Sequence, residues 1–391
     1  MTTLDSEYGL PIAEVLDVLR EHAGHADKQA VFPAASMDVI RKAGLLGLLV
    51  PAEYGGRGAG LPDFVAVAQR LAGACLSTAS IWAMHCQQVD AVIRYGADAL
   101  KDELLPSVAR GDTYLASVTT EAANNWSFIT AHAPITPDVN GVHLDRLAPV
   151  VSGGEYADGF LITMRAGEDT SVHEVSLVYA ARGQVAIESS GDWDTLGMRA
   201  MDNVSLRISG TVPEHHVVGG PGAFRAIASE SAIPLAHLGL SACWLGAARQ
   251  AFAELVGHLR GSRRKGGPSL SSDLVRERLA RIRFDLELVH AYLQRVTGEV
   301  AELREGAGKV SPQVMQIHLN TLKLAASELS FRATDRMIDL AGLSVGYSAQ
   351  SPIPLERVFR DLRSASLNYS NDRLWTANGA LTLWDRHITL A

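Results

Sequence analysis

The sequence predicts an α+β multidomain fold, in which a middle antiparallel β-domain separates an N-terminal helical domain from a C-terminal four-helix bundle. Apolar residues recur at helical spacing in both end regions, whereas the middle region consists of short runs rich in Val, Thr, Ile and Tyr. The length of 391 residues is enough for two or three packed units. We place the domains at 1–112, 113–222 and 223–391.

The N-terminal region has the pattern of amphipathic helices. Apolar residues recur here at spacings of three and four residues, which is typical of one apolar helix face. They are Ile12, Val15, Leu16 and Leu19. The glycine-rich stretch 51–60 interrupts this pattern. It neither follows a strand nor has the spacing of a phosphate-binding loop, so we predict a turn there.

The middle region has the features of a β-domain. Val175–Ala180 and Val204–Ile208 are alternating or apolar runs rich in β-branched residues, which predict strands. The dipeptide Asn140-Gly141 is typical of a tight turn between two paired strands. A barrel or sandwich is therefore expected.

Helical periodicity returns after residue 223 and continues almost to the end. Leu235, Leu238 and Leu245 mark one long helix, and a second helix follows it. Ser311-Pro312 has the residue types of an N-cap and first helical position, which predicts the start of a third helix. Several long amphipathic helices in series predict a helical bundle.

Composition excludes several functional classes. The net charge of −8, without an extended basic stripe, argues against a nucleic-acid partner. The apolar runs are too short to span a membrane, and the N-terminus lacks the basic region of a secretory signal, so we expect a cytoplasmic protein with no membrane partner. Cys75, Cys86 and Cys243 lie in apolar helical patterns without metal-binding spacing, which predicts buried free thiols and no metal.

Two segments carry a family resemblance. Trp193–Arg199, with the sequence WDTLGMR, resembles the W-x-x-L-G-M-R segment of acyl-CoA dehydrogenases, and Pro354–Asp361 resembles the P-L-E-R-x-x-R-D box of the same family. The turn at 51–56 resembles the family's P-x-x-Y-G-G turn. This resemblance covers nearly the whole chain and implies a flavin cofactor. We expect Arg360-Asp361 to be structural, because an arginine can tie the last helices to the bundle.

The resemblance also implies a flavin site. Two segments of the middle domain look like the family's flavin-facing strands, where backbone N–H groups tune the ring. Without the family context these would be ordinary strand residues. The neighbouring subunit would hold part of the cofactor by a pyrophosphate-binding arginine and a glycine-bearing loop, both of which depart here from the usual pattern. FAD is expected, with FMN as the alternative, and the candidate contacts are Val118, Thr119, Thr120, Val151, Ser152, Arg263, Gly342 and Gly346.

The catalytic base of the family is missing. Oxidation of an acyl thioester requires a carboxylate to remove the α-proton. The resemblance implies a glutamate where this chain has Tyr369, or, in some members, on the first long bundle helix, where this chain has Ala236 followed by His237. Asp372 is the nearest substitute, and Glu121 is a more distant one. Asp372 beside Arg373 would otherwise be a solvated acid at a helix start.

Two enzymatic readings remain open. The first is α,β-dehydrogenation of an acyl thioester of CoA or a carrier protein, with hydride transfer to FAD and Asp372 as base. The second resembles the family's two-component monooxygenases, which use reduced flavin and O₂ on a heteroatom or aromatic substrate and need no such base; His85 and Asn368 would then stand near the reacting oxygen, with Tyr369 beside them. A histidine on an apolar helix is otherwise a core residue. A flavin-binding scaffold without catalysis is a third possibility.

The expected partners follow from these readings. They are an acyl thioester or another small-molecule substrate and, for the monooxygenase, a flavin reductase. The resemblance implies a homotetramer built from C-terminal bundles, or a homodimer as the smaller assembly.

Overall fold

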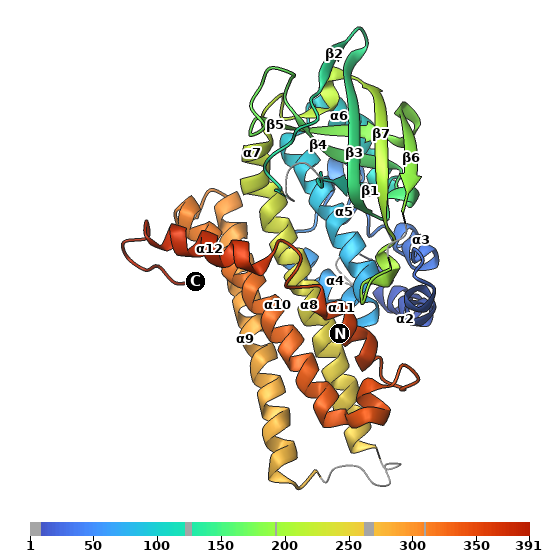
Figure 1. Cartoon of the computed structure of the whole chain (residues 1–391), viewed down its shortest axis with the longest axis vertical. Coiled ribbons are helices and arrows are strands. Elements are labelled where there is room, and N and C mark those ends of the chain that lie inside the picture. The colour runs from blue at the N-terminus through green and yellow to red at the C-terminus, as the bar shows by residue number, and fades with distance from the viewer. Residues whose placement is uncertain (1–8, 122–126, 192–193, 262–269, 309) are drawn as a thin grey trace. The chain divides into compact units, whose positions relative to one another are not determined.

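Two compact units make up the chain in the computed structural model, which describes residues 9–121, 127–191, 194–261, 270–308 and 310–391. The first unit comprises Met1–Gly60, Ile81–Asp194 and Ala200–Ala236, and the second comprises Leu61–Ser80, Thr195–Arg199 and His237–Ala391. The helical, β and helical order along the chain confirms the predicted fold class (Figure 1). The division into three domains at 112 and 222 stays a prediction.

The first unit contains two four-stranded sheets. One has the order β1-β4-β5-β8 and the other β2-β3-β7-β6. Asp138 pairs with Gly141, so the predicted Asn-Gly turn does join two strands. The strands are β1 (Leu115–Val118), β2 (Thr136–Asp138), β3 (Gly141–Ser152), β4 (Gly159–Arg165), β5 (Val175–Ala181), β6 (Val185–Ser190), β7 (Asn203–Val212) and β8 (Val217–Val218).

One strand pair departs from the antiparallel expectation. β1 and β4 are parallel, with Leu115 opposite Gly159 and Val118 opposite Ile162. No tight turn joins these strands, because the chain passes through β2 and β3 between them. A long connection allows parallel pairing, whereas a hairpin imposes antiparallel pairing.

Helices of the first unit cover the β1-β4-β5-β8 sheet. Apolar side chains of α5 (Leu76–Tyr95) and α6 (Asp98–Arg110), among them Val92 and Leu104, share one buried cluster with Leu161 and Leu177 of this sheet. Residues of α5 from Ile81 onward belong to this unit. The remaining helices of the unit are α2 (Ile12–Gln29), α3 (Ala34–Lys42) and α7 (Phe224–Ile227).

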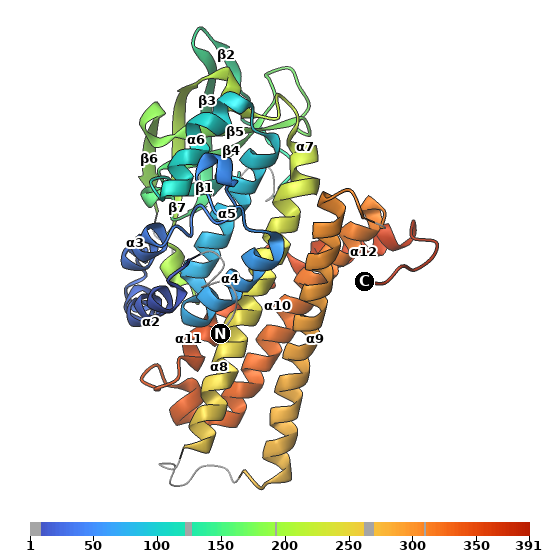
Figure 2. The ribbon, with the colours of Figure 1, turned by 180° about the vertical axis from the view of Figure 1, so that it is seen from behind.

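The second unit is built from long helices that lie side by side in both views (Figures 1 and 2). The Ser311 hydroxyl accepts a hydrogen bond from the N–H of Val314, which confirms the predicted N-cap of α10. Gly246 allows two helices to approach closely, because a Cβ there would lie 2.2 Å from the carbonyl oxygen of Gln69. The helices are α4 (Leu61–Ala74), α8 (Ile233–Arg260), α9 (Asp273–Arg304), α10 (Pro312–Gly342), α11 (Leu355–Arg363) and α12 (Asn371–Thr382).

Residues 195–199 of the W-x-x-L-G-M-R segment are hydrogen-bonded to the P-L-E-R-x-x-R-D box within the second unit. The Asp361 carboxylate accepts a hydrogen bond of 2.5 Å from the N–H of Met198, and Arg360 donates to the carbonyl of Leu196 at 3.1 Å. Met198 has a φ of 56°, which turns its N–H toward α11. The pair Arg360-Asp361 therefore makes structural contacts with the segment 195–199, whereas the expected tie of the last helices to the bundle stays a prediction. Trp193 lies outside the described residues.

One helical stretch, 224–260, is long and apolar enough to cross a membrane by length and composition. However, 94% of its most apolar window is buried inside the protein. Core helices of soluble enzymes pass the same test, so this stretch is weak evidence for a membrane span.

Candidate active site

The five candidate flavin residues of the first unit lie at the adjoining ends of β1 and β3. The Thr120 hydroxyl donates to the carbonyl of Val150 at 2.8 Å and accepts from its N–H at 3.3 Å. A β-bulge between Ala148 and Val151 breaks the ladder at this point, and bulges are common beside active sites. The structure thus brings together Val118, Thr119, Thr120, Val151 and Ser152, whose contact with a flavin stays a prediction.

Side-chain burial limits what these residues can offer. Val118 and Val151 are fully buried, backbone included. Thr119, Thr120 and Ser152 are half-buried. The Ser152 hydroxyl donates to Asn203 at 2.5 Å. Of the five candidates, the half-buried Thr119, Thr120 and Ser152 are therefore the ones open to the pyrimidine end of a flavin ring, which needs hydrogen-bond donors.

Glu121, the more distant candidate base, is held in an ion pair. Its carboxylate lies 2.9 Å from the guanidinium of the fully buried Arg146. The same carboxylate accepts hydrogen bonds from the backbone N–H groups of His132 and Ala133 at 2.8 and 3.0 Å. Both carboxylate oxygens of Glu121 are occupied by partners within this unit. Glu121 therefore has a structural role in this unit.

His85 is fully buried and uses both ring nitrogens within the protein. Its Nδ1 accepts from the N–H of Leu115 at 3.0 Å, and its Nε2 lies 3.1 Å from the carbonyl oxygen of Leu46. Burial lowers the pKa of His85 to about 4, so the ring is neutral. This arrangement fits the core-histidine reading, and no ring nitrogen is left for a reacting oxygen.

The glycine-bearing loop of the second unit begins in a conformation that glycine favours. Gly342 has φ 72° and ψ −176°, and a π-helical turn, Leu343–Tyr347, follows it. Gly346 is buried, and a Cβ there would lie 2.7 Å from the carbonyl oxygen of Ile338. A cofactor contact at Gly342 and Gly346 stays a prediction. Arg263 lies outside the described residues.

Asp372 does not lie in a buried site within this chain. It occupies the first turn of α12 and is exposed, as is Asn368 in the preceding loop. A catalytic carboxylate for α-proton removal needs a water-poor setting that raises its proton affinity. In this chain, the environment of Asp372 matches the alternative reading of a solvated acid at a helix start.

The two positions where the resemblance implies a base come together. His237 of α8 and Tyr369 of the loop before α12 have ring centroids 5.5 Å apart, in an edge-to-face arrangement. His237 is 3% exposed and its Nδ1 has no hydrogen-bond partner among the described residues, whereas Tyr369 is 36% exposed. The chain therefore brings together Tyr369 and the ring next to Ala236, the two places where the resemblance implies a carboxylate.

Lys323 of α10 adds a positive charge to this cluster. It is fully buried, its Nζ donates to Asn371 Oδ1 at 2.6 Å, and it lies 5.7 Å from the centroid of the Trp244 ring. Burial lowers the pKa of Lys323 to about 8. Burial and then the Lys323 charge lower the pKa of His237 to about 3, against a smaller opposing effect of Asn320. We did not identify Lys323 from the sequence, although a lysine between Leu322 and Leu324 in a core helix is a signal for it.

The buried Lys323 predicts a pH-dependent stability. Below pH 8 both the folded and the unfolded chain carry the proton, so the cost of burying the cation is present in full. Between pH 8 and 10.5 the Lys323 amine has lost its proton in the folded chain but keeps it in the unfolded chain. The free energy of unfolding therefore rises with pH across this range. Relative to a Lys323→Met variant, the native chain should gain up to about 3 kcal/mol across this window. Urea unfolding at a series of pH values measures this difference, and parallel curves for the two proteins would contradict it.

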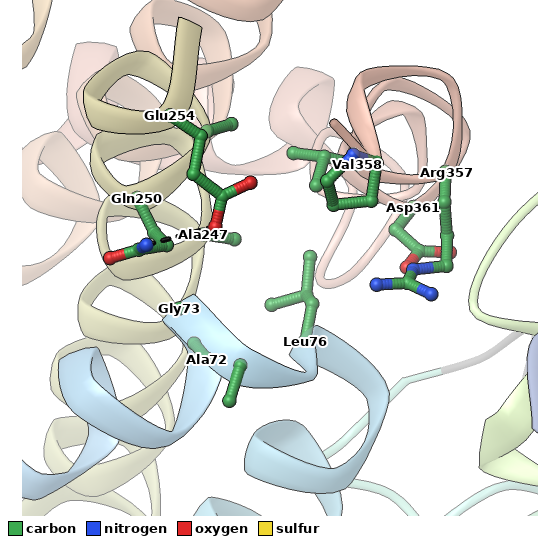
Figure 3. Close-up of a pocket in the computed structure, with 12 residues that line it drawn as sticks. Ala72, Gly73, Leu76, Ala247, Gln250, Glu254, Arg357, Val358 and Asp361 are labelled. Atoms are coloured by element: carbon green, nitrogen blue, oxygen red, sulfur yellow. Dashed lines mark hydrogen bonds between the residues drawn. The ribbon is translucent and has the colours of Figure 1, made fainter. Parts of the chain in front are cut away.

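A pocket beside the P-L-E-R-x-x-R-D box is too small for a substrate. Figure 3 shows Arg357 and Asp361 of α11 on one side and Gln250 and Glu254 of α8 on the other. Gln250 donates to Glu254 at 2.9 Å. The space admits about one water molecule. This pocket therefore belongs to the helix packing rather than to the reaction.

Comparisons with known proteins agree with the fold and the order of the elements. Residues 14–112 match the family model of the acyl-CoA dehydrogenase N-terminal domain, and residues 227–367 match that of the C-terminal domain. The acryloyl-CoA reductase (NADH) of Anaerotignum propionicum is 25% identical over 90% of this chain and 84% of its own length. The amino sugar nitrososynthase DnmZ of Streptomyces peucetius is 26% identical over 89% and 85%. The FMN-bound structure of TdsC from Paenibacillus sp. A11-2 has a TM-score of 0.85 at 23% identity and covers 96% of both chains.

Proposed function

Because this chain belongs to the acyl-CoA dehydrogenase superfamily and is a flavin-dependent oxidoreductase, we propose that it is a flavin-dependent monooxygenase, which uses reduced flavin and O₂ on a small-molecule substrate. The cofactor is FAD, with FMN as the alternative. The observation that supports this choice is the absence of a carboxylate at both expected base positions, where this chain has Tyr369 and Ala236 followed by His237. The ring of the exposed Tyr369 contacts the buried His237, and the charge of Lys323 acts on His237.

The cluster is unsuited to removal of an α-proton. Proton transfer to His237 would create a second buried cation beside Lys323, and the pKa of about 3 shows how strongly the protein disfavours it. A general base works well when its pKa lies near the working pH. Glu121 is held by Arg146, and Asp372 is exposed. The described residues thus offer a weak base where dehydrogenation needs a strong one.

The same cluster is suited to holding an anion and donating protons. When bound, reduced flavin would supply the two electrons that activate O₂, and O₂ would supply both the transferred oxygen atom and the one released as water. The Lys323 cation, present below about pH 8, favours negative charge nearby. The phenol of Tyr369 can donate a hydrogen bond, and the neutral His237 ring can hold a partner in place. Trp244 and the apolar faces of α8 and α10 exclude water from the buried side.

Dehydrogenation of an acyl thioester is the second candidate. Similarity to the acryloyl-CoA reductase over 90% of this chain favours it. In that case Asp372 would have to act as the base, covered by a neighbouring subunit. The two candidates therefore differ in the residue on which turnover depends.

The partners follow from the first candidate. A separate flavin reductase would supply the reduced cofactor, and the substrate would carry a nitrogen or sulfur atom or an aromatic ring, as the nitrososynthase DnmZ and the TdsC monooxygenase suggest for this scaffold. We further propose a cytoplasmic homotetramer, with a homodimer as the smaller assembly.

A two-arm experiment distinguishes the candidates. In the first arm, the flavin-loaded protein is mixed anaerobically with a series of acyl-CoA thioesters, and we expect no bleaching of the flavin. In the second arm, a flavin reductase supplies reduced flavin in isotopically labelled O₂ together with indole, dibenzothiophene or an amino sugar. We expect the label in an organic product. Anaerobic bleaching by a thioester, abolished in Asp372→Asn, would overturn the proposal in favour of the dehydrogenase.

A further inference from the structure

Three side chains of the first unit, apart from the proposed reaction site, have the arrangement of metal ligands. Glu103 lies on α6, and His215 and His216 lie on the short 3₁₀ turn Glu214–His216 that follows β7. The Nε2 atoms of His215 and His216 lie 3.4 and 3.1 Å from the same carboxylate oxygen, Oε2 of Glu103. All three ligand atoms lie within 4.8 Å of one another. Two imidazoles thus point to one oxygen.

We propose that Glu103, His215 and His216 bind a divalent transition-metal cation of the Zn²⁺ type. Zinc binds histidine nitrogen and carboxylate oxygen at about 2.0–2.2 Å in tetrahedral geometry, and such ligands are about 3.3 Å apart along an edge of the tetrahedron. The two nitrogen–oxygen separations of 3.4 and 3.1 Å match this edge. Two histidines and one glutamate are also a frequent zinc ligand set.

The fold positions these side chains in addition to the hydrogen bonds that His215 and His216 make with Glu103. His216 is fully buried, and its ring lies 5.0 Å from the ring of Tyr179 on β5. Glu103 follows Leu100 by less than one turn and precedes Leu104, and both leucines are anchored in the buried cluster of this unit. The His215 and His216 rings are perpendicular, with centroids 4.7 Å apart, so their Nε2 atoms can approach a cation from two directions.

The site is open on one side. The side chains of Glu103 and His215 are 46% and 38% exposed, which leaves a path for the cation and a position for a water ligand. A bound cation would join α6 to the turn after β7. The expected consequence is a more stable first unit, because a ligand that binds only the folded chain raises the melting temperature.

Calorimetric titration of the metal-free, full-length protein with ZnCl₂ tests the site. We expect one Zn²⁺ per chain at this site, a higher melting temperature, and X-ray absorption distances of about 2.0–2.1 Å to nitrogen or oxygen. Glu103→Gln and His215→Ala should each weaken binding by about 10-fold or more. Both residues are partly exposed, so these variants should fold.

His173→Ala is the matched control, because His173 is an exposed histidine of the same unit. This variant should bind Zn²⁺ as the native chain does. Zn²⁺ binding that survives both Glu103→Gln and His215→Ala would place the cation elsewhere and overturn the proposal. Absence of Zn²⁺ binding to the native chain would overturn it as well. Neither outcome depends on the oxygenation reaction.

Discussion

Tyr369→Phe should reduce oxygen transfer by about 10²-fold or more, because it removes a proton donor from the reaction site. The substitution deletes only the hydroxyl, and Tyr369 is 36% exposed, so the packing against His237 should be kept. His237→Leu should reduce oxygen transfer by a similar factor, since it removes a neutral ring that can hold a reaction partner in place. The Nδ1 of this ring has no hydrogen-bond partner among the described residues. Product formation per reduced flavin measures both effects.

Asp372→Asn is the matched control for these variants. Asp372 lies three residues from Tyr369, but it is exposed in this chain. Its substitution should leave product formation within about two-fold of the native rate, as is usual for surface changes. Flavin affinity should be unchanged in all three proteins. A large loss in Asp372→Asn combined with normal turnover in Tyr369→Phe would contradict the assignment of the site.

The fold could be predicted because its signals are local. The Asn140-Gly141 turn, the N-cap at Ser311 and the strands around Val175 and Val204 each depend on a few neighbouring residues. The parallel pairing of β1 with β4 could not be predicted in this way. It depends on where a long connection returns the chain, and no short pattern encodes that return.

The candidate site could not be predicted from the sequence, because it depends on contacts between residues that are distant along the chain. The resemblance pointed separately to Ala236-His237 and to Tyr369, and only the structure shows that the rings of His237 and Tyr369 meet. Lys323 donates a hydrogen bond to Asn371 and lowers the pKa of His237, and both residues lie on other segments of the chain. His85 illustrates the reverse case, because its sequence context suits a catalytic residue, while Leu46 and Leu115 occupy both of its nitrogens.

Gly197→Ala should lower the free energy of unfolding by about 3–5 kcal/mol, because the added methyl group has no room. A Cβ at position 197 would lie 2.1 Å from the carbonyl oxygen of Arg360 and 2.6 Å from the N of Asp361. These are backbone atoms of α11, so the segment 195–199 and the helix would have to separate.

That separation would also break the contacts beside it. The hydrogen bond from Met198 to Asp361 involves a buried carboxylate, and its loss removes one of the contacts that stabilise this buried charge. Gly298→Ala in α9 is the opposite control, because a Cβ there meets no atom within 4 Å and alanine favours a helix interior by about 0.5–1 kcal/mol. Thermal unfolding should therefore shift downward for Gly197→Ala and slightly upward for Gly298→Ala. Equal shifts would mean that the W-x-x-L-G-M-R segment doesn't depend on close contact with α11.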